Sequence, residues 1–104
     1  MEKRVVVTGI GVVSPVGNNV DAMWESIKAG KHGIAEITRF DLEGHKVTLA
    51  AEVKDFDFGD RRAAKRLDIA DQYALAAARE AVEDSGIVSG ENVDPDRFGI
   101  YGGT

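Results

Sequence analysis

The sequence predicts an α/β fold built on a mostly parallel sheet. Three observations support it: a β-branched apolar run near the N-terminus, an alanine-lined amphipathic segment later, and the order strand, helix, short strand, helix, strand. With 104 residues, the chain has room for one domain with a modest core.

The first predicted element is a buried strand over residues 4–13. The run is nearly continuously apolar, which is typical of a strand covered by helices on both faces. Gly9, Gly11, the Ser14-Pro15 pair and Gly17 then predict a sharp bend where the strand leaves its sheet. The run is too short to span a membrane and lacks a signal cleavage site, so a buried strand is the better interpretation.

A short helix is predicted next, with Asn18 or Asn19 as its cap. Its apolar residues recur at i, i+3, i+4 and i+7 from Val20, and Gly30 stands where a left-handed residue ends such a helix. Residues 31–44 are predicted to form an ordered loop and residues 47–53 a short strand. Residues 55–60 are predicted to be a connection anchored by Phe56 and Phe58.

The clearest predicted helix follows Asp68, a plausible cap. Alanines repeat along it at three- and four-residue steps, so a neighbouring backbone can come close and we expect deep packing. The segment Asp84-Ser85-Gly86 ends this helix, and residues 98–101 are predicted to be a final buried strand. No helix follows to cover that strand before Thr104, so we expect residues 1–104 to be the amino-terminal piece of a larger protein.

Composition excludes several classes of protein. The net charge of −5 argues against general nucleic-acid binding, which requires a basic face. The chain has no cysteine, which excludes disulfides, thiolate metal sites and a thiol nucleophile within it. We expect a cytoplasmic protein with neither a nucleic-acid nor a membrane partner.

A dinucleotide site is one hypothesis for the Gly9-Ile10-Gly11 turn. The dinucleotide fingerprint needs a third glycine that opens a helix, and here that position is Ser14, followed by Pro15. A lone Gly-x-Gly is weak evidence, and nucleotide binding remains the less favoured alternative.

The opening run "RVVVTGIGVVSPVGNN" resembles the amino-terminal signature of the elongating β-ketoacyl-[acyl-carrier-protein] synthases, the condensing enzymes of type II fatty-acid synthesis. Further similar segments follow in the family's order: Trp24, "GKHGI" from Gly30, "RFD" from Arg39, "AAEVKDFD" from Ala50, "KRLD" from Lys65, "QYALAAAREAVEDSG" from Gln72 and the terminal "FGIYGGT".

The resemblance implies a thiolase-like fold of layered α/β halves, of which residues 1–104 form only the amino-terminal part, working as a homodimer. It implies decarboxylative condensation of a cysteine-bound acyl group with malonyl-carrier protein, in fatty-acid or related polyketide synthesis. No cofactor is implied beyond the phosphopantetheine arm that carries the substrates. The family's catalytic cysteine and histidines lie downstream, so no catalytic residue is assigned here and we expect these 104 residues alone to be inactive. A non-catalytic relative of the chain-length-factor type, which keeps the carrier surface, is the main alternative.

Four cations lie within six residues: Arg61, Arg62, Lys65 and Arg66. Helical spacing would make Arg62–Arg66 and Arg61–Lys65 like-charged neighbours. One interpretation is a solvated face, partly neutralised by nearby acids (Asp57, Asp60 and Asp68). The resemblance implies instead that Arg62, Lys65 and Arg66 bind the acidic acyl carrier protein and the phosphate of its pantetheine arm.

The two histidines, His32 and His45, have no partner at metal-ligand spacing. We interpret both as solvated loop residues and expect no metal site.

Overall fold

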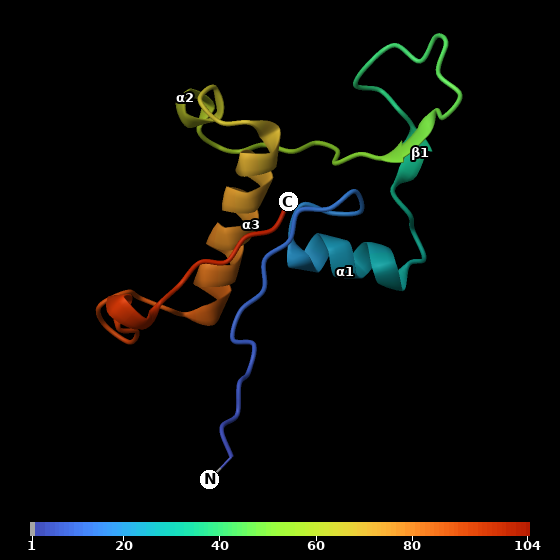
Figure 1. Cartoon of the computed structure of the whole chain (residues 1–104). Coiled ribbons are helices and arrows are strands. Elements are labelled where there is room, and N and C mark those ends of the chain that lie inside the picture. The colour runs from blue at the N-terminus through green and yellow to red at the C-terminus, as the bar shows by residue number, and fades with distance from the viewer. Residues whose placement is uncertain (1) are drawn as a thin grey trace.

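Helices make up most of the regular structure (Figure 1). The computed structural model describes residues 2–104, so Met1 of the predicted domain 1–104 lies outside the described residues. The elements in chain order are α1 (Val20–Lys28), β1 (Ile34–Glu36), β2 (Leu49–Ala51), α2 (Arg61–Ala64), α3 (Ile69–Ser85) and the 3₁₀ turn η1 (Pro95–Arg97).

Helix α1 begins and ends as its sequence predicts. The Asn19 side chain accepts a hydrogen bond from the Ala22 N–H at 2.8 Å, which satisfies one of the unpaired donors of the first turn. At the other end Gly30 has a φ of 71°, and its N–H donates to the Ile27 carbonyl. The Lys31 N–H donates to the Ser26 carbonyl, which completes a Schellman motif.

Helix α3 also has the predicted ends. Asp68 occupies the N-cap position, although its side chain makes no capping hydrogen bond, and Gly86 ends the helix with a φ of 72°. The expectation of deep packing is wrong for the described residues, because α3 has no fully buried residue. The close approach itself is present: Gly9 lies against the Ala81 backbone and Gly11 against the Ala77 backbone.

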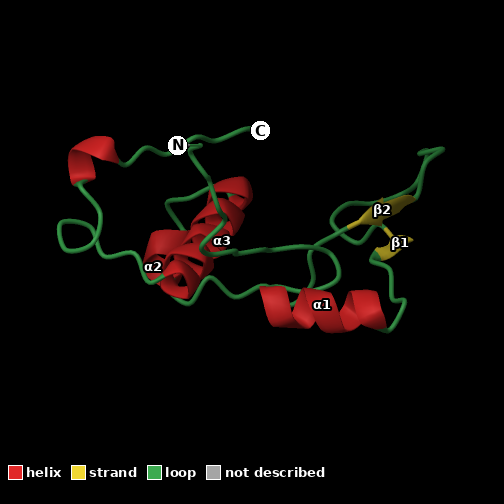
Figure 2. Ribbon diagram, turned by 90° about the horizontal axis from the view of Figure 1, so that it is seen from below, coloured by secondary structure: helices red, strands yellow, loops and turns green. Residues whose placement is uncertain are grey.

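The only sheet in residues 2–104 is a two-stranded antiparallel hairpin of β1 and β2 (Figure 2). Ile34 pairs with Ala51 and Glu36 with Leu49. Strand β2 confirms the strand predicted within 47–53, whereas β1 lies inside the predicted loop 31–44. The predicted parallel sheet is not formed by these residues: β1 and β2, joined by the loop 37–48, pair antiparallel, and residues 2–104 contain no other named strand that could pair with them in parallel.

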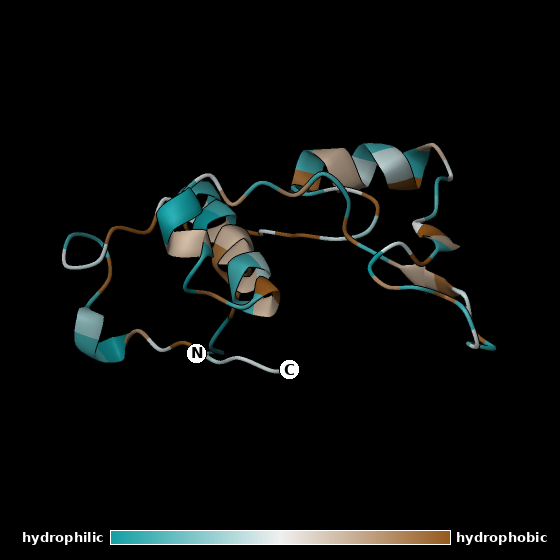
Figure 3. Cartoon of the chain, turned by 90° about the horizontal axis from the view of Figure 1, so that it is seen from above, coloured by the Kyte–Doolittle hydropathy of each residue, from teal (hydrophilic) through white to brown (hydrophobic). Residues whose placement is uncertain are grey.

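The predicted buried strands over 4–13 and 98–101 are wrong for the described chain. Val5 is 97% exposed and Tyr101 is 96% exposed, and neither segment lies in a named strand. A strand requires a neighbour to complete its ladder, and two of the backbone donors of the first segment bond side chains instead. The N–H of Ile10 donates to Asp84 and that of Val12 to Glu80, both on α3. The exposed apolar residues are visible as brown stretches of loop near both termini (Figure 3).

The chain is elongated, with extents of 58 × 35 × 22 Å and a radius of gyration of 17.4 Å. A compact domain of this length would have a radius of gyration of about 13 Å. No side chain of residues 2–104 is fully buried, so the layers of the predicted fold are not developed in this part of the molecule. None of the helices described is long and apolar enough to cross a membrane.

Candidate functional site

The candidate site is the basic cluster, Arg61, Arg62, Lys65 and Arg66, on α2 and the turn after it. All four side chains are exposed, while Ala63 and Ala64 between them and Leu67 directly after them are half-buried. The segment therefore turns its apolar residues inward and its cations toward solvent.

The neighbouring acids make no ion pair with this cluster within residues 2–104. The Asp60 carboxylate caps α2, accepting hydrogen bonds from the N–H groups of Arg62 at 3.0 Å and Ala63 at 3.1 Å. The Asp57 carboxylate accepts from the Gly59 N–H at 2.8 Å. Within residues 2–104 the ion pairs are Lys28–Glu25 and Arg39–Glu52, and neither includes a member of the cluster.

The predicted helical spacing holds for only part of the cluster, because α2 ends at Ala64. Lys65 is the C-cap, and its N–H still donates to the Arg61 carbonyl at 3.2 Å. The Arg66 N–H instead donates to the Ala63 carbonyl at 3.0 Å, in the tighter pattern of a 3₁₀ turn. The structure brings the predicted residues Arg62, Lys65 and Arg66 together on one helical turn and its continuation.

The connection before α2 lies against α3, and both predicted aromatic anchors are present. The Phe56 ring meets the Tyr73 ring edge-on at 4.8 Å, and the Arg79 guanidinium lies 4.8 Å from the centre of the Phe58 ring. These two contacts hold the chain that leads into the basic cluster.

The supporting roles of two residues, Asp60 and Gln72, were not predicted from the sequence. Asp60 could have been identified, because an aspartate directly before a short alanine-containing segment is a common N-cap. Gln72 could not: its amide Nε2 donates to the carbonyls of Ala64 at 3.1 Å and Leu67 at 3.2 Å, and no spacing rule connects residues so placed.

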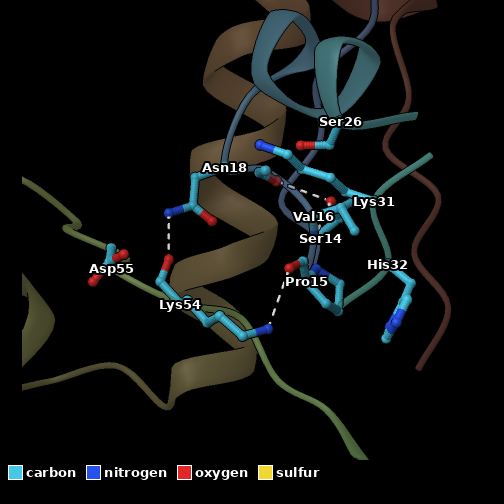
Figure 4. A pocket seen from close by; sticks show the side chains of 10 residues that line it. Ser14, Pro15, Val16, Asn18, Ser26, Lys31, His32, Lys54 and Asp55 are labelled. Carbon is cyan, nitrogen blue, oxygen red and sulfur yellow. Dashed lines mark hydrogen bonds between the residues drawn. The ribbon is translucent and has the colours of Figure 1, made fainter. Parts of the chain in front are cut away.

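A second candidate is an open cavity of about 340 Å³ beside the turn of residues 14–17 (Figure 4). Lys54 lines it, but its ammonium donates to the carbonyls of Pro15 at 3.4 Å, Gly33 at 3.1 Å and Glu52 at 3.0 Å. The Asn18 amide donates to the Lys54 carbonyl at 2.8 Å. These bonds join three loops to one another, so Lys54 serves the protein's own backbone.

The histidines are both exposed. His32 accepts a hydrogen bond from the Ile34 N–H through Nδ1 at 3.3 Å, and the His45 ring lies 5.4 Å from that of Phe40. Among residues 2–104, no group of three or more histidine, cysteine or acidic side chains is placed to hold a metal ion.

Glu52 has an altered pKa. The Thr38 N–H donates to its carboxylate at 3.1 Å, and this backbone hydrogen bond is the main cause of a pKa below the usual glutamate range. The Thr38 hydroxyl at 3.0 Å and the Arg39 guanidinium at 3.8 Å act in the same direction. Arg39 also donates to the Tyr73 hydroxyl at 2.6 Å, which connects the hairpin to α3.

The Gly9-Ile10-Gly11 turn does not have the geometry of a dinucleotide site. Its glycines lie against the backbone of α3, and the next helix begins only at Val20. A pyrophosphate site requires the glycine turn to lead directly into a helix N-terminus.

The similarity to known proteins agrees with the resemblance seen in the sequence. The family profile "Beta-ketoacyl synthase, N-terminal domain" matches residues 2–104, and the chain belongs to this family. The chain is 47% identical to "3-oxoacyl-[acyl-carrier-protein] synthase 2" of Staphylococcus aureus (strain COL), over 98% of this chain and 25% of that protein. It is also 47% identical to the protein of that name from Coxiella burnetii (strain RSA 493 / Nine Mile phase I), over 96% and 25%.

A solved structure is similar as well. The structure of "The ishigamide ketosynthase/chain length factor" aligns with a TM-score of 0.63 and 40% identity, over 80% of this chain and 21% of that one. Family and structural neighbour together imply a thiolase-like fold. The chain spans about a quarter of the length of the curated relatives it matches.

Proposed function

We propose that the whole protein is a 3-oxoacyl-[acyl-carrier-protein] synthase that elongates acyl chains by decarboxylative condensation with malonyl-carrier protein. The observation that carries this proposal is the 47% identity to proteins of that name across nearly all of this chain. The chemistry needs an activated thiolate nucleophile and an oxyanion hole. The 104 residues contain no cysteine, so the nucleophile must be supplied by a part of the protein outside them.

The rest of the proposal concerns the assembly around this chain. Residues 1–104 form the amino-terminal part of a layered α/β half, and the whole protein is a cytoplasmic homodimer. Its substrates arrive on the phosphopantetheine of acyl carrier protein, and no further cofactor is required. The exposed apolar segments at both ends of the chain support this arrangement, because the remaining strands of a layered sheet would cover them.

Within this chain, the proposed role is to bind the carrier protein through Arg62, Lys65 and Arg66. The support is that these cations are exposed, lie close together in the chain and have no ion-pair partner within residues 2–104. An acidic carrier with a phosphate on its arm has the complementary charge. Such attraction mainly speeds association, and salt screens it.

The test is the double charge reversal Lys65→Glu/Arg66→Glu in the whole protein. We expect Kd for the phosphopantetheinylated carrier to rise about tenfold or more at low salt, because attraction is replaced by repulsion. We also expect the association rate to depend less steeply on ionic strength. Surface plasmon resonance over a range of salt concentrations measures both quantities.

The matched control is Lys31→Glu/Lys46→Glu, which changes the net charge equally at exposed lysines outside the cluster. It should change Kd far less than the first pair does. Equal effects of the two double variants, or none at low salt, would contradict the assignment of the carrier surface.

A non-catalytic subunit is the second candidate. The observation that favours this candidate is the similarity of this chain to the solved structure of a ketosynthase/chain length factor. Both candidates would bind the carrier protein through the same surface, but only the enzyme would have a nucleophilic cysteine. Cysteine at the family's nucleophile position in the whole protein indicates the enzyme, and any other residue there indicates the non-catalytic subunit.

A further inference from the structure

The basic cluster lies on a segment that would not stay helical in isolation. Helix α2 has four residues, and an isolated helix this short is unstable in water, because forming the first turn costs more than its few hydrogen bonds return. Asp60 secures the first end of the helix. At its other end the N–H groups of Lys65, Arg66 and Leu67 donate to carbonyls within the same segment, and these bonds do not attach the segment to the rest of the chain.

Gln72 on α3 attaches this segment to the longer helix. Its Nε2 donates to the Ala64 carbonyl at 3.1 Å, in the last residue of α2, and to the Leu67 carbonyl at 3.2 Å. The two acceptors lie on either side of Lys65 and Arg66 in the chain. Within residues 2–104, these are the hydrogen bonds that join segment 61–67 to α3, and the Gln72 side chain is partly buried where it makes them.

We propose that Gln72 is a positioning residue for carrier-protein recognition, fixing the direction in which the Lys65 and Arg66 side chains leave the surface. The inference rests on the proposed function of the basic cluster. Gln72 carries no charge, and this role requires no contact between Gln72 and the carrier. It acts through the backbone on both sides of the two cations.

This role predicts a particular kinetic signature. Long-range attraction depends on the number of cations, which removal of the Gln72 amide leaves unchanged. The docked complex depends on where those cations lie, so its dissociation rate should rise. Charge reversal of Lys65 and Arg66 affects chiefly association, so the two kinds of variant separate in one experiment.

The test compares Gln72→Met with Tyr73→Phe in the whole protein. Gln72→Met keeps the length of the side chain and removes both donors, whereas Tyr73→Phe removes the hydroxyl that accepts a hydrogen bond from Arg39, outside the basic cluster. For Gln72→Met we expect dissociation from the phosphopantetheinylated carrier to be about three- to tenfold faster, with the salt dependence of association unchanged. Tyr73→Phe should leave both quantities as in the wild type.

Hydrogen exchange of the peptide covering residues 61–68 gives a second measurement, available in the wild type even if Gln72→Met fails to fold. In the protein without bound carrier this peptide should be protected, and Gln72→Met should lose that protection while α3 keeps its own. Exchange at the rate of an unstructured peptide in the wild type would overturn the inference.

The outcomes distinguish this inference from the proposed function. Wild-type dissociation in Gln72→Met, together with weakened binding in Lys65→Glu/Arg66→Glu, overturns the role of Gln72 and leaves the carrier surface in place. Unchanged binding in the charge-reversed variant overturns both.

Discussion

Gly9 and Gly11 allow the amino-terminal segment to approach α3 at backbone distance. A Cβ on Gly11 would overlap the Ala77 carbonyl oxygen and lie 2.8 Å from the Ala81 nitrogen. Backbone atoms in a helix cannot move aside cheaply, so these glycines are required by packing. The alanine-lined face of α3 is the other half of the same contact.

We expect Gly11→Ala to lower the free energy of unfolding by about 1–3 kcal/mol, the usual cost of overpacking a close contact. Chemical denaturation of the whole protein measures it. The control is Lys46→Ala, at an exposed residue of the loop between β1 and β2. The control should stay within about 0.5 kcal/mol of the wild type. A loss at Gly11 no larger than that of the control would contradict the close approach.

At the scale of elements, side chains rather than a shared core join the pieces of this chain. Glu80 on α3 accepts from Val12 N at 2.9 Å with one oxygen and from Val20 N, at the start of α1, at 3.0 Å with the other. A carboxylate there also faces the positive end of the α1 dipole. The hairpin is joined to α3 by Arg39, which contacts both Glu52 and Tyr73.

The pKa of Glu52 makes the hairpin's contribution to stability depend on pH. A carboxyl whose pKa is lowered by folding stabilises the native state fully above its unfolded pKa, about 4.3 for glutamate, and the effect is lost as the pH falls through the folded value. We therefore expect wild type to exceed Glu52→Gln in unfolding free energy at neutral pH. The difference should vanish below the folded pKa.

Urea denaturation at a series of pH values measures this difference. Glu36→Gln, a change of the same kind on strand β1, is the control and should give a difference that varies much less over the same range. A gap between wild type and Glu52→Gln that is constant with pH would contradict the hydrogen-bonded carboxylate described above.

At the scale of the whole molecule, the two most exposed apolar segments lie near the two ends of the described chain. Val5, Val7, Ile100 and Tyr101 are each at least 80% exposed. Apolar side chains in such a row favour burial by about 25 cal/mol per Å². The proposed layered sheet would bury them and pair their backbone groups.

In the whole protein we expect the amides of residues 5–7 and 98–101 to be strongly protected from hydrogen exchange, because both segments would lie in the sheet. Mass spectrometry of peptides covering them measures the protection, with the polar segment 90–94 as an internal comparison. Exchange as fast as in an unstructured peptide would contradict the layered arrangement.

The ends of α1 and α3 and the family itself could be predicted from the sequence, because caps such as Asn19, Gly30 and Gly86 act on groups within a few residues. The family can likewise be recognised from the order of its motifs along the chain, without three-dimensional information. The local sequence does not determine whether residues 4–13 and 98–101 form strands, since a strand needs a hydrogen-bonded neighbour, which can be distant in the chain.

The basic cluster illustrates the same division. The sequence alone shows that four cations lie within six residues of one another. Whether Gln72 would reach the carbonyls of Ala64 and Leu67 depended on how the chain turns back between α2 and α3. Contacts between residues several turns apart are made by the folded path of the chain, and no local pattern encodes that path.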